Sequence, residues 1–196
     1  DINIEFCLAT RDPQGNPTDG ITRTSTTGGQ LFGFFSPIFE DAKYDSLGGK
    51  DAWPADQYLN IWVCEMIPGL LGYAQFPGGN SSTDGVVLGG SYFGVTNGVY
   101  GGGRTATHEV GHYLNLRHIW GDGRCRQDDF VIDTPSSDGA NYGCPSYPTV
   151  NCSSTDMTMN YMDYTDDGCK YMFTDGQRNR MRAIFATGGP RETMIQ

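Results

Sequence analysis

The sequence predicts an α+β fold with two subdomains, and three observations lead to this prediction. Short β-branched and aromatic runs fill the first half of the 196-residue chain, and one helix is indicated near its middle. From residue 119 the chain becomes irregular and rich in Gly, Asp, Ser, Pro and Cys, and it ends in a second helix. We therefore expect an upper subdomain over 1–118, with a sheet and the middle helix, and a lower subdomain over 119–196.

The strand candidates are short apolar runs bounded by Gly, Pro, Asn or Asp. They are 3–9, 58–66, 72–77 and 85–90, with 21–24 as a weaker fifth. Residues 11–20 consist almost entirely of turn-forming residues. Residues 25–57 are ambiguous, and a short helix within 36–49 is one interpretation of them.

Two helices are predicted. The first covers about 104–115, directly after a glycine triplet, Gly101 to Gly103, that ends any preceding element. The second begins near Asp175, with Thr174 or Asp175 as its cap and Gly188 at its end.

Charge and composition argue against several kinds of partner. The formal net charge of −10 disfavours nucleic acids and anionic membrane surfaces. No apolar stretch approaches the roughly 18 residues that a membrane span needs. Ten of the 23 acidic residues lie between 119 and 175, and all ten are Asp. Most of them fit a solvated acidic face, and a few fit a site for a hard cation or for a basic group of a substrate.

Six cysteines indicate disulfides and an oxidising compartment. Cys125, Cys144, Cys152 and Cys169 lie in a loop-rich stretch without a C-x-x-C pair, so a zinc knuckle is disfavoured. Cys7 and Cys64 lie in apolar runs, where they either pair with each other or remain free buried thiols. We expect a secreted protein whose signal peptide has been removed, because none precedes DINIEFCLA.

All three histidines of the chain lie in one stretch, HEVGHYLNLRH at 108–118. His108 and His112 are four residues apart, so a helix places both imidazoles on one face, ready to share a cation. Glu109 projects about 100° around the helix from His108, beside the cation and not onto it. That position suits a carboxylate that takes a proton from a metal-activated water.

His118 completes the set only if the helix ends near Asn115. A straight helix would carry it about 600° around and roughly 9 Å along from His112, too far to reach the same ion. Asn tolerates positive φ, and Asn115 stands where the chain must turn back. Three neutral imidazoles leave the fourth position of Zn²⁺ open, which is typical of catalytic sites. H-E-x-x-H alone is a modest signal that also fits a satisfied histidine pair, and the third histidine favours zinc.

The pattern H-E-x-x-H-x-x-N-x-x-H resembles the long zinc signature of the metzincin metalloproteases, H-E-x-x-H-x-x-G-x-x-H. The pappalysin branch also has Asn in place of the Gly. MNYMDYTDDGC at 159–169 resembles the Met-turn of the family, and the segments NIEFCLA, YLNIWV, GRTATHEVGH, DTP and FTDGQRNRM extend the resemblance over most of the chain. The sequence resembles pappalysins of the ulilysin and mirolysin type, which are secreted microbial endopeptidases.

The resemblance implies a metzincin-like catalytic domain. In such a domain a twisted mixed β-sheet and an active-site helix lie above the cleft, and an irregular, disulfide-linked part lies below it. The implied residue roles are one catalytic zinc on His108, His112 and His118, Glu109 as general base and acid, Tyr164 as hydrogen-bond donor to the oxyanion, and Met162 as the floor under the metal. Without the resemblance, Tyr164 and Met162 are equally well read as ordinary core residues.

Three further features follow from the resemblance alone. The disulfides would be Cys125–Cys152 and Cys144–Cys169. CRQDDFVIDTP at 125–135 would bind one or two structural calcium ions, although a plain acidic loop is the alternative. Asp129 and Thr134 match the ligand positions best, and Asp122 and Asp133 are additions. Asp167, or Asp166 if the register shifts by one, would line the pocket for the residue after the scissile bond and select Arg, and Lys less well.

The expected reaction is hydrolysis of a peptide bound along 72–77 or 85–90 as an added strand. The resemblance also leads us to expect a further strand and a backing helix before residue 3. A cleaved N-terminal fragment that remains attached is one explanation of their absence. Two other functions stay open: a non-catalytic binding module stabilised by zinc and calcium, and a zinc amidase that acts on something other than proteins.

Overall fold

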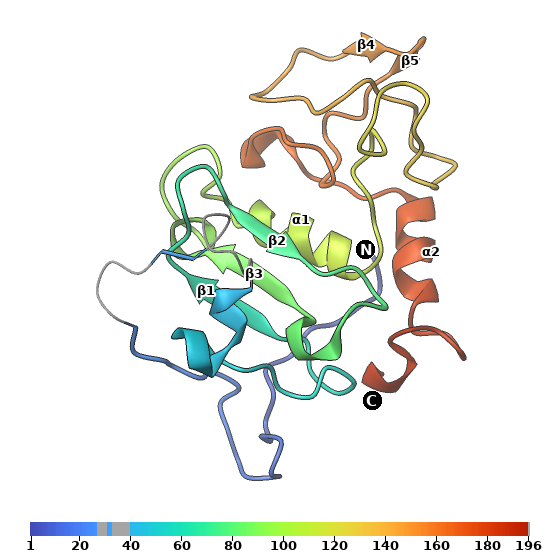
Figure 1. The fold of residues 1–196 in the computed structure, drawn as a ribbon. Helices are drawn as coiled ribbons and strands as arrows, with labels where there is room; N and C mark the ends of the chain where they lie inside the picture. Colours follow the sequence, from blue (N-terminus) through green and yellow to red (C-terminus); the bar gives the residue numbers. More distant parts are fainter. Residues whose placement is uncertain (27–30, 33–39, 196) are drawn as a thin grey trace.

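The structure is a computed structural model that describes residues 1–26, 31–32 and 40–195. Within these residues a mixed sheet has the strand order β1-β3-β2 (Figure 1). Strand β1 (Ile61–Cys64) runs parallel to β3 (Val86–Gly89), and β2 (Gly72–Ala74) runs antiparallel to β3. The central strand β3 is fully buried, as expected for a β-branched run covered on both faces. Strand β2 is therefore an edge of the sheet. Of the two segments expected to receive a peptide, 72–77 contains this edge strand, whereas 85–90 contains the central strand.

Helix α1 (Arg104–Tyr113) covers one face of the sheet and begins at Gly103, whose φ of 76° a side chain would strain. The main core lies between this helix and the sheet and continues into the second half of the chain, where Met162, Met181 and Ile184 join it. A smaller cluster on the other face packs around Trp62, next to the short 3-10 helices η1 (Asp41–Lys43) and η2 (Asp45–Leu47).

The second half of the chain is mostly irregular, and Figure 1 shows it lying along one side of α1 and the sheet. It contains a small hairpin of β4 (Val150–Asn151) and β5 (Ser154–Thr155) and the helix α2 (Asp175–Ala183). Four more short 3-10 helices complete the described elements: η3 (Ser81–Thr83), η4 (Gly90–Tyr92), η5 (Asp167–Cys169) and η6 (Glu192–Met194). Disulfides join Cys125 to Cys152 and Cys144 to Cys169, the pairing implied by the resemblance.

Both predicted helices are present, with small differences at their ends. Helix α1 stops two residues before the predicted limit of 115. Helix α2 is capped by Thr174, whose hydroxyl oxygen accepts a hydrogen bond from the amide of Gln177. The side-chain oxygen of Gln177 in turn accepts from the backbone amide of Thr174, which completes a capping box. The helix ends at Ala183, so Gly188, although at φ 79°, ends a later turn and not the helix.

Two strand predictions are wrong. Residues 3–9 and 21–24 form no strand. Phe6 and Leu8 are 54% and 64% exposed, and Asn3 has a φ of 54°, so the apolar alternation of this segment is not matched by a pairing partner among the described residues. In the ambiguous region the helical residues are those of η1 and η2, while 27–30 and 33–39 lie outside the described residues. Cys7 and Cys64 are both free thiols.

Candidate metal centre and catalytic site

The three histidines converge on one point. Ligand nitrogens of His108, His112 and His118 all lie within 4.8 Å of one another, and the Nε2 atoms of His112 and His118 are 3.1 Å apart. The side chains of His108 and His112 are buried and come from the same face of α1. The structure thus brings together the three residues that the sequence predicted as ligands.

A hydrogen bond at Nδ1 fixes the tautomer of each histidine ring. Nδ1 of His108 donates to the carbonyl of Tyr161 (2.7 Å), and Nδ1 of His112 donates to the carbonyl of Leu116 (2.8 Å). Nδ1 of His118 bonds to the carboxylate of Asp122. Carbonyl and carboxylate oxygens only accept, so each proton sits on Nδ1 and each Nε2 presents a lone pair to the common point.

This donor set fits zinc. Two facing lone pairs 3.1 Å apart repel each other unless a cation lies between them. Nitrogens that each lie about 2.0–2.1 Å from one tetrahedral zinc are about 3.3–3.4 Å apart, close to the spacing found. Burial lowers the pKa of His112 to about 4 and lowers the pKa of His108 well below its usual range, so both rings are neutral ligands at ordinary pH.

The bend that delivers His118 lies where the sequence predicted it. Asn115 has a φ of 76°. The backbone amides of Asn115 and Leu116 donate hydrogen bonds to carbonyls of the last turn of α1. The amide of Ile119 then bonds to the carbonyl of Met162, which ties the chain after the bend to the predicted Met-turn. Met162 itself is fully buried against Gly111 of α1, the helix that carries His108 and His112.

Glu109 is buried on α1 beside edge strand β2, close to Gly72. Burial raises the pKa of its carboxyl to about 8, and the positive charge of Lys170 opposes this shift. A carboxyl whose pKa lies near the operating pH can, in its ionised form, accept a proton from water and then return it.

Tyr164 lies against the rings of His108 and His118 and is partly exposed. Its ring is 5.5 Å from that of His108 and 4.9 Å from that of His118, and the residue is 36% exposed. Burial of part of the ring raises the pKa of the phenol to about 12, so the hydroxyl stays protonated and can donate. The ring of Trp120 stacks on that of His118 at 4.3 Å and meets that of Tyr164 edge-on at 5.0 Å, and the sequence predicts neither contact.

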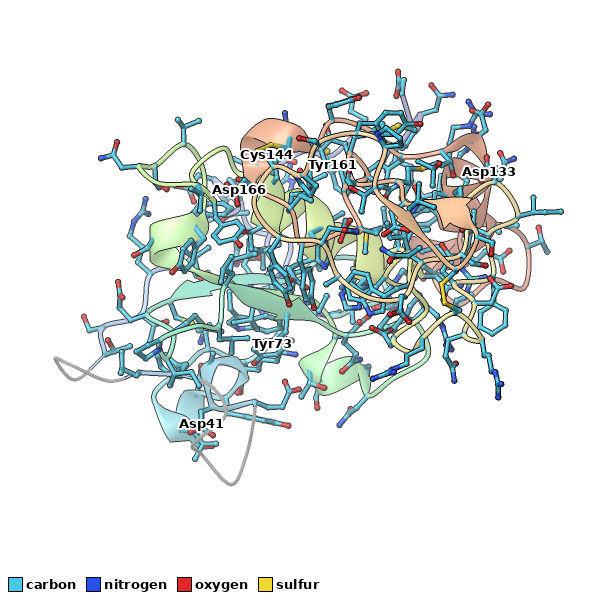
Figure 2. All side chains as sticks on the ribbon, turned by 90° about the horizontal axis from the view of Figure 1, so that it is seen from above. Asp41, Tyr73, Asp133, Cys144, Tyr161 and Asp166 are labelled. Carbon is cyan, nitrogen blue, oxygen red and sulfur yellow. A yellow bond between two sulfur atoms is a disulfide. The ribbon has the colours of Figure 1, made fainter. Side chains whose placement is uncertain are left out.

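Asp167 lies at the N-terminus of α1. Its Oδ2 accepts from the amides of Gly102 (2.9 Å) and Arg104 (3.0 Å), and its Oδ1 is 3.8 Å from the ammonium of Lys170. One oxygen is therefore committed to capping the helix. Figure 2 shows the neighbouring Asp166 on the same side of the molecule as Tyr161.

The four predicted calcium ligands do not meet at one place. Asp129 and Thr134 are together, with both carboxylate oxygens 2.8 Å from the hydroxyl of Thr134. Asp122 instead supports His118. Asp133 accepts from Thr174 and Gly176 at the start of α2, and Figure 2 shows it well away from Tyr161 and Asp166.

Sequence reasoning missed the groups that hold the histidines from outside. Two of them are backbone carbonyls, which carry no residue-specific signal. Asp122, four residues after His118, was readable as an orienting carboxylate because such partners commonly accept from ligand histidines.

A helix with two histidines and a glutamate, a sharp bend to a third histidine, and a buried methionine packed against that helix define a metzincin-type zinc domain. The chain belongs to the M43 peptidase family, described as pregnancy-associated plasma protein-A, whose model matches residues 43–186.

Similar proteins agree with this assignment. An extracellular metalloprotease of Arthroderma benhamiae is 38% identical over 150 residues, covering 70% of this chain and 55% of the relative. One of Pyricularia oryzae is 40% identical over 138 residues, covering 65% and 48%. The structure of mature mirolysin of Tannerella forsythia in complex with a cleaved peptide matches with a TM-score of 0.93 and 51% identity over 98% of this chain and 75% of that chain. The chain thus spans about half the length of the curated relatives it matches.

Proposed function

We propose that the protein is a secreted zinc-dependent endopeptidase. The observation that carries this proposal is the set of three neutral imidazoles with converging lone pairs beside a buried glutamate. Relatives named extracellular metalloproteases, and the two disulfides, support secretion. Among the described residues no helix has the length and apolar character needed to cross a membrane.

The chain supplies the binding and proton-transfer steps. A peptide strand pairs with edge strand β2, between residues 1–118 and 119–196, which brings its carbonyl to the histidines. His108, His112 and His118 would hold the zinc ion, which would supply a Lewis acid and a water of lowered pKa. Glu109 takes a proton from the attacking water and passes it to the leaving nitrogen. The phenol of Tyr164 donates to the oxygen of the tetrahedral intermediate.

We also propose that Asp167 recognises a basic residue directly after the scissile bond, Arg in preference to Lys. The support is chemical: Oδ1 of Asp167 is buried and has no hydrogen-bond partner, so a guanidinium can donate to it. Because Oδ2 is already bonded to two amides, this contact is a single hydrogen bond and not a bidentate one.

A structural calcium ion is proposed at Asp129 and Thr134. Both carboxylate oxygens of Asp129 and the carbonyl of Val131 lie within 2.6–2.8 Å of the hydroxyl of Thr134. One hydroxyl hydrogen satisfies only one of these oxygens, and a hard cation satisfies them together.

The test compares the wild-type protein, a chelator-treated sample and Glu109→Ala on a mixed peptide library, with products read by mass spectrometry. We expect cleavage by the wild type alone, full zinc content in Glu109→Ala, and restored activity when zinc is returned after chelation. Equal cleavage by Glu109→Ala and wild type would falsify the mechanism. Full zinc content without cleavage of any peptide by the wild type would favour a binding module.

A further inference from the structure

Lys170 is a buried lysine next to the acidic residue proposed to read the substrate. Its side chain is 5% exposed and that of Asp167 is 3% exposed, and Nζ of the lysine is 3.8 Å from Oδ1 of the aspartate. The segment is fixed from both sides, because Cys169 is bridged to Cys144 and Oδ2 of Asp167 is held by α1. The fold therefore holds these two opposite charges at a fixed distance from each other.

Lys170 and Asp167 form an ion pair without a hydrogen bond between them. A separation of 3.8 Å is too long for a hydrogen bond, and Oδ1 of Asp167 has no hydrogen-bond partner. At this distance the ammonium of Lys170 and the carboxylate of Asp167 interact by charge and not through a hydrogen bond. The charges of Asp163, Glu109 and Asp166 also act on it, from farther away. Buried polar groups with unused hydrogen-bonding capacity accept a polar group of a ligand readily.

An arginine side chain that reaches Oδ1 of Asp167 must approach the lysine ammonium at close range. Two like charges at such a separation in a buried site repel strongly. An uncharged carboxamide can instead donate to Asp167 and accept from Lys170, and a carboxylate can accept from Lys170. The lysine thus opposes the preference that the aspartate alone would give.

We propose that Lys170 is a specificity-determining residue, whose ammonium offsets the charge of Asp167 so that the pocket after the scissile bond discriminates only weakly in favour of Arg. This inference rests on the proposed endopeptidase function. It concerns which side chains the pocket accepts and not the chemistry of hydrolysis.

The first test measures kcat/KM on peptides that differ only after the cleaved bond, with Arg, Gln, Leu or Glu. We expect the wild type to favour Arg over Leu by less than about tenfold. Lys170→Met, which keeps the chain length and removes the charge, should raise the Arg-to-Leu ratio at least tenfold and lower the rate with Glu. Lys170→Arg should keep the wild-type profile. Lys50→Met is the matched control, because Lys50 pairs at the surface with Asp45 of η2, in the first half of the chain.

An unchanged Arg-to-Leu ratio in folded Lys170→Met overturns the proposal. If Lys170→Met does not fold, Asp167→Asn tests the same pair from the other side. It leaves the lysine unopposed and keeps an oxygen for the amides of α1, so the Glu-to-Arg ratio should rise at least tenfold. A fall or no change in that ratio contradicts the proposal.

A second test separates this inference from the proposed function. Calorimetry on the Glu109→Ala protein, with and without Lys170→Met, measures binding of the same peptides without cleavage. Tighter binding of the Arg peptide on loss of Lys170 supports the specificity role even if no peptide is cut. If peptides are cut but neither binding nor cleavage selectivity depends on Lys170, the endopeptidase assignment stands and the specificity role does not.

Discussion

The guanidinium of Arg180 donates a 2.7 Å hydrogen bond from Nε to the carbonyl of Asn115, the residue at which the chain bends towards His118. Arg191 donates from Nε to the carbonyl of Tyr113 at 3.2 Å and pairs with Asp84. Two arginines from the last part of the chain therefore hold carbonyls on both sides of the bend. Carbonyls at a helix C-terminus lack partners within the helix, and cationic donors stabilise them. The geometry of the zinc ligands depends on residues more than 60 positions away in sequence.

The bond from Arg180 predicts an effect on zinc affinity. Arg180→Met should weaken zinc binding about tenfold, since partners that orient ligands typically contribute this much. It should also lower the free energy of unfolding by about 1–2 kcal/mol. Competition with a chromogenic chelator measures the affinity. The control is Arg182→Met on the exposed side of the same helix, which should bind zinc like the wild type. Equal losses in the two variants would contradict a role of Arg180 at the bend.

The positive φ of Asn115 predicts which replacements the bend tolerates. Asn115→Gly should keep zinc and stability close to wild type, because Gly adopts this conformation freely. Asn115→Val should cost about 1–2 kcal/mol or more, because a branched Cβ clashes in the left-handed region. Urea unfolding measures both. Asn179→Val, at an exposed position of α2 outside the positive-φ set, is the matched control and should change stability by less than about 0.5 kcal/mol.

Gly111 predicts a steric link between α1 and Met162. A Cβ on this glycine would lie 2.4 Å from Sδ of Met162, which is fully buried and has little room to move. Gly111→Ala should therefore cost about 1–3 kcal/mol and weaken zinc binding by displacing the floor of the site. In a double-mutant cycle with Met162→Ala, the second change should recover part of the loss. Strict additivity of the two costs would show that the clash does not reach the methionine.

The parts of the site that the sequence predicted are local in the chain. The two helical histidines and Asn115 obey backbone geometry over eight residues, so spacing alone places them. The failures involve partners that are distant in sequence. Asp133 is placed by Gly176, 43 residues away, and the apolar run 3–9 has strand composition but no strand to pair with among the described residues. The edge position of β2 is likewise a property of the whole sheet and not of its own residues.

The two disulfides predict equal effects on stability and unequal effects on activity. Their sequence separations are 27 and 25, so loop closure gives each about 3–4 kcal/mol of stability in the chain-entropy model. Replacing either pair by serines should lower the unfolding free energy by a similar amount, whereas Cys7→Ser, at an exposed free thiol, should have almost no effect.

Cys169, however, lies between Asp167 and Lys170, while Cys125 and Cys152 belong to the loops around the hairpin β4–β5. Loss of Cys144–Cys169 should therefore also change the ratio of cleavage rates between Arg and Leu peptides at a temperature where both variants are folded. Loss of Cys125–Cys152 should leave that ratio as it is in the wild type. The same change of ratio in both variants would mean that general loosening of the second half of the chain, and not the position of Cys169, controls the selectivity.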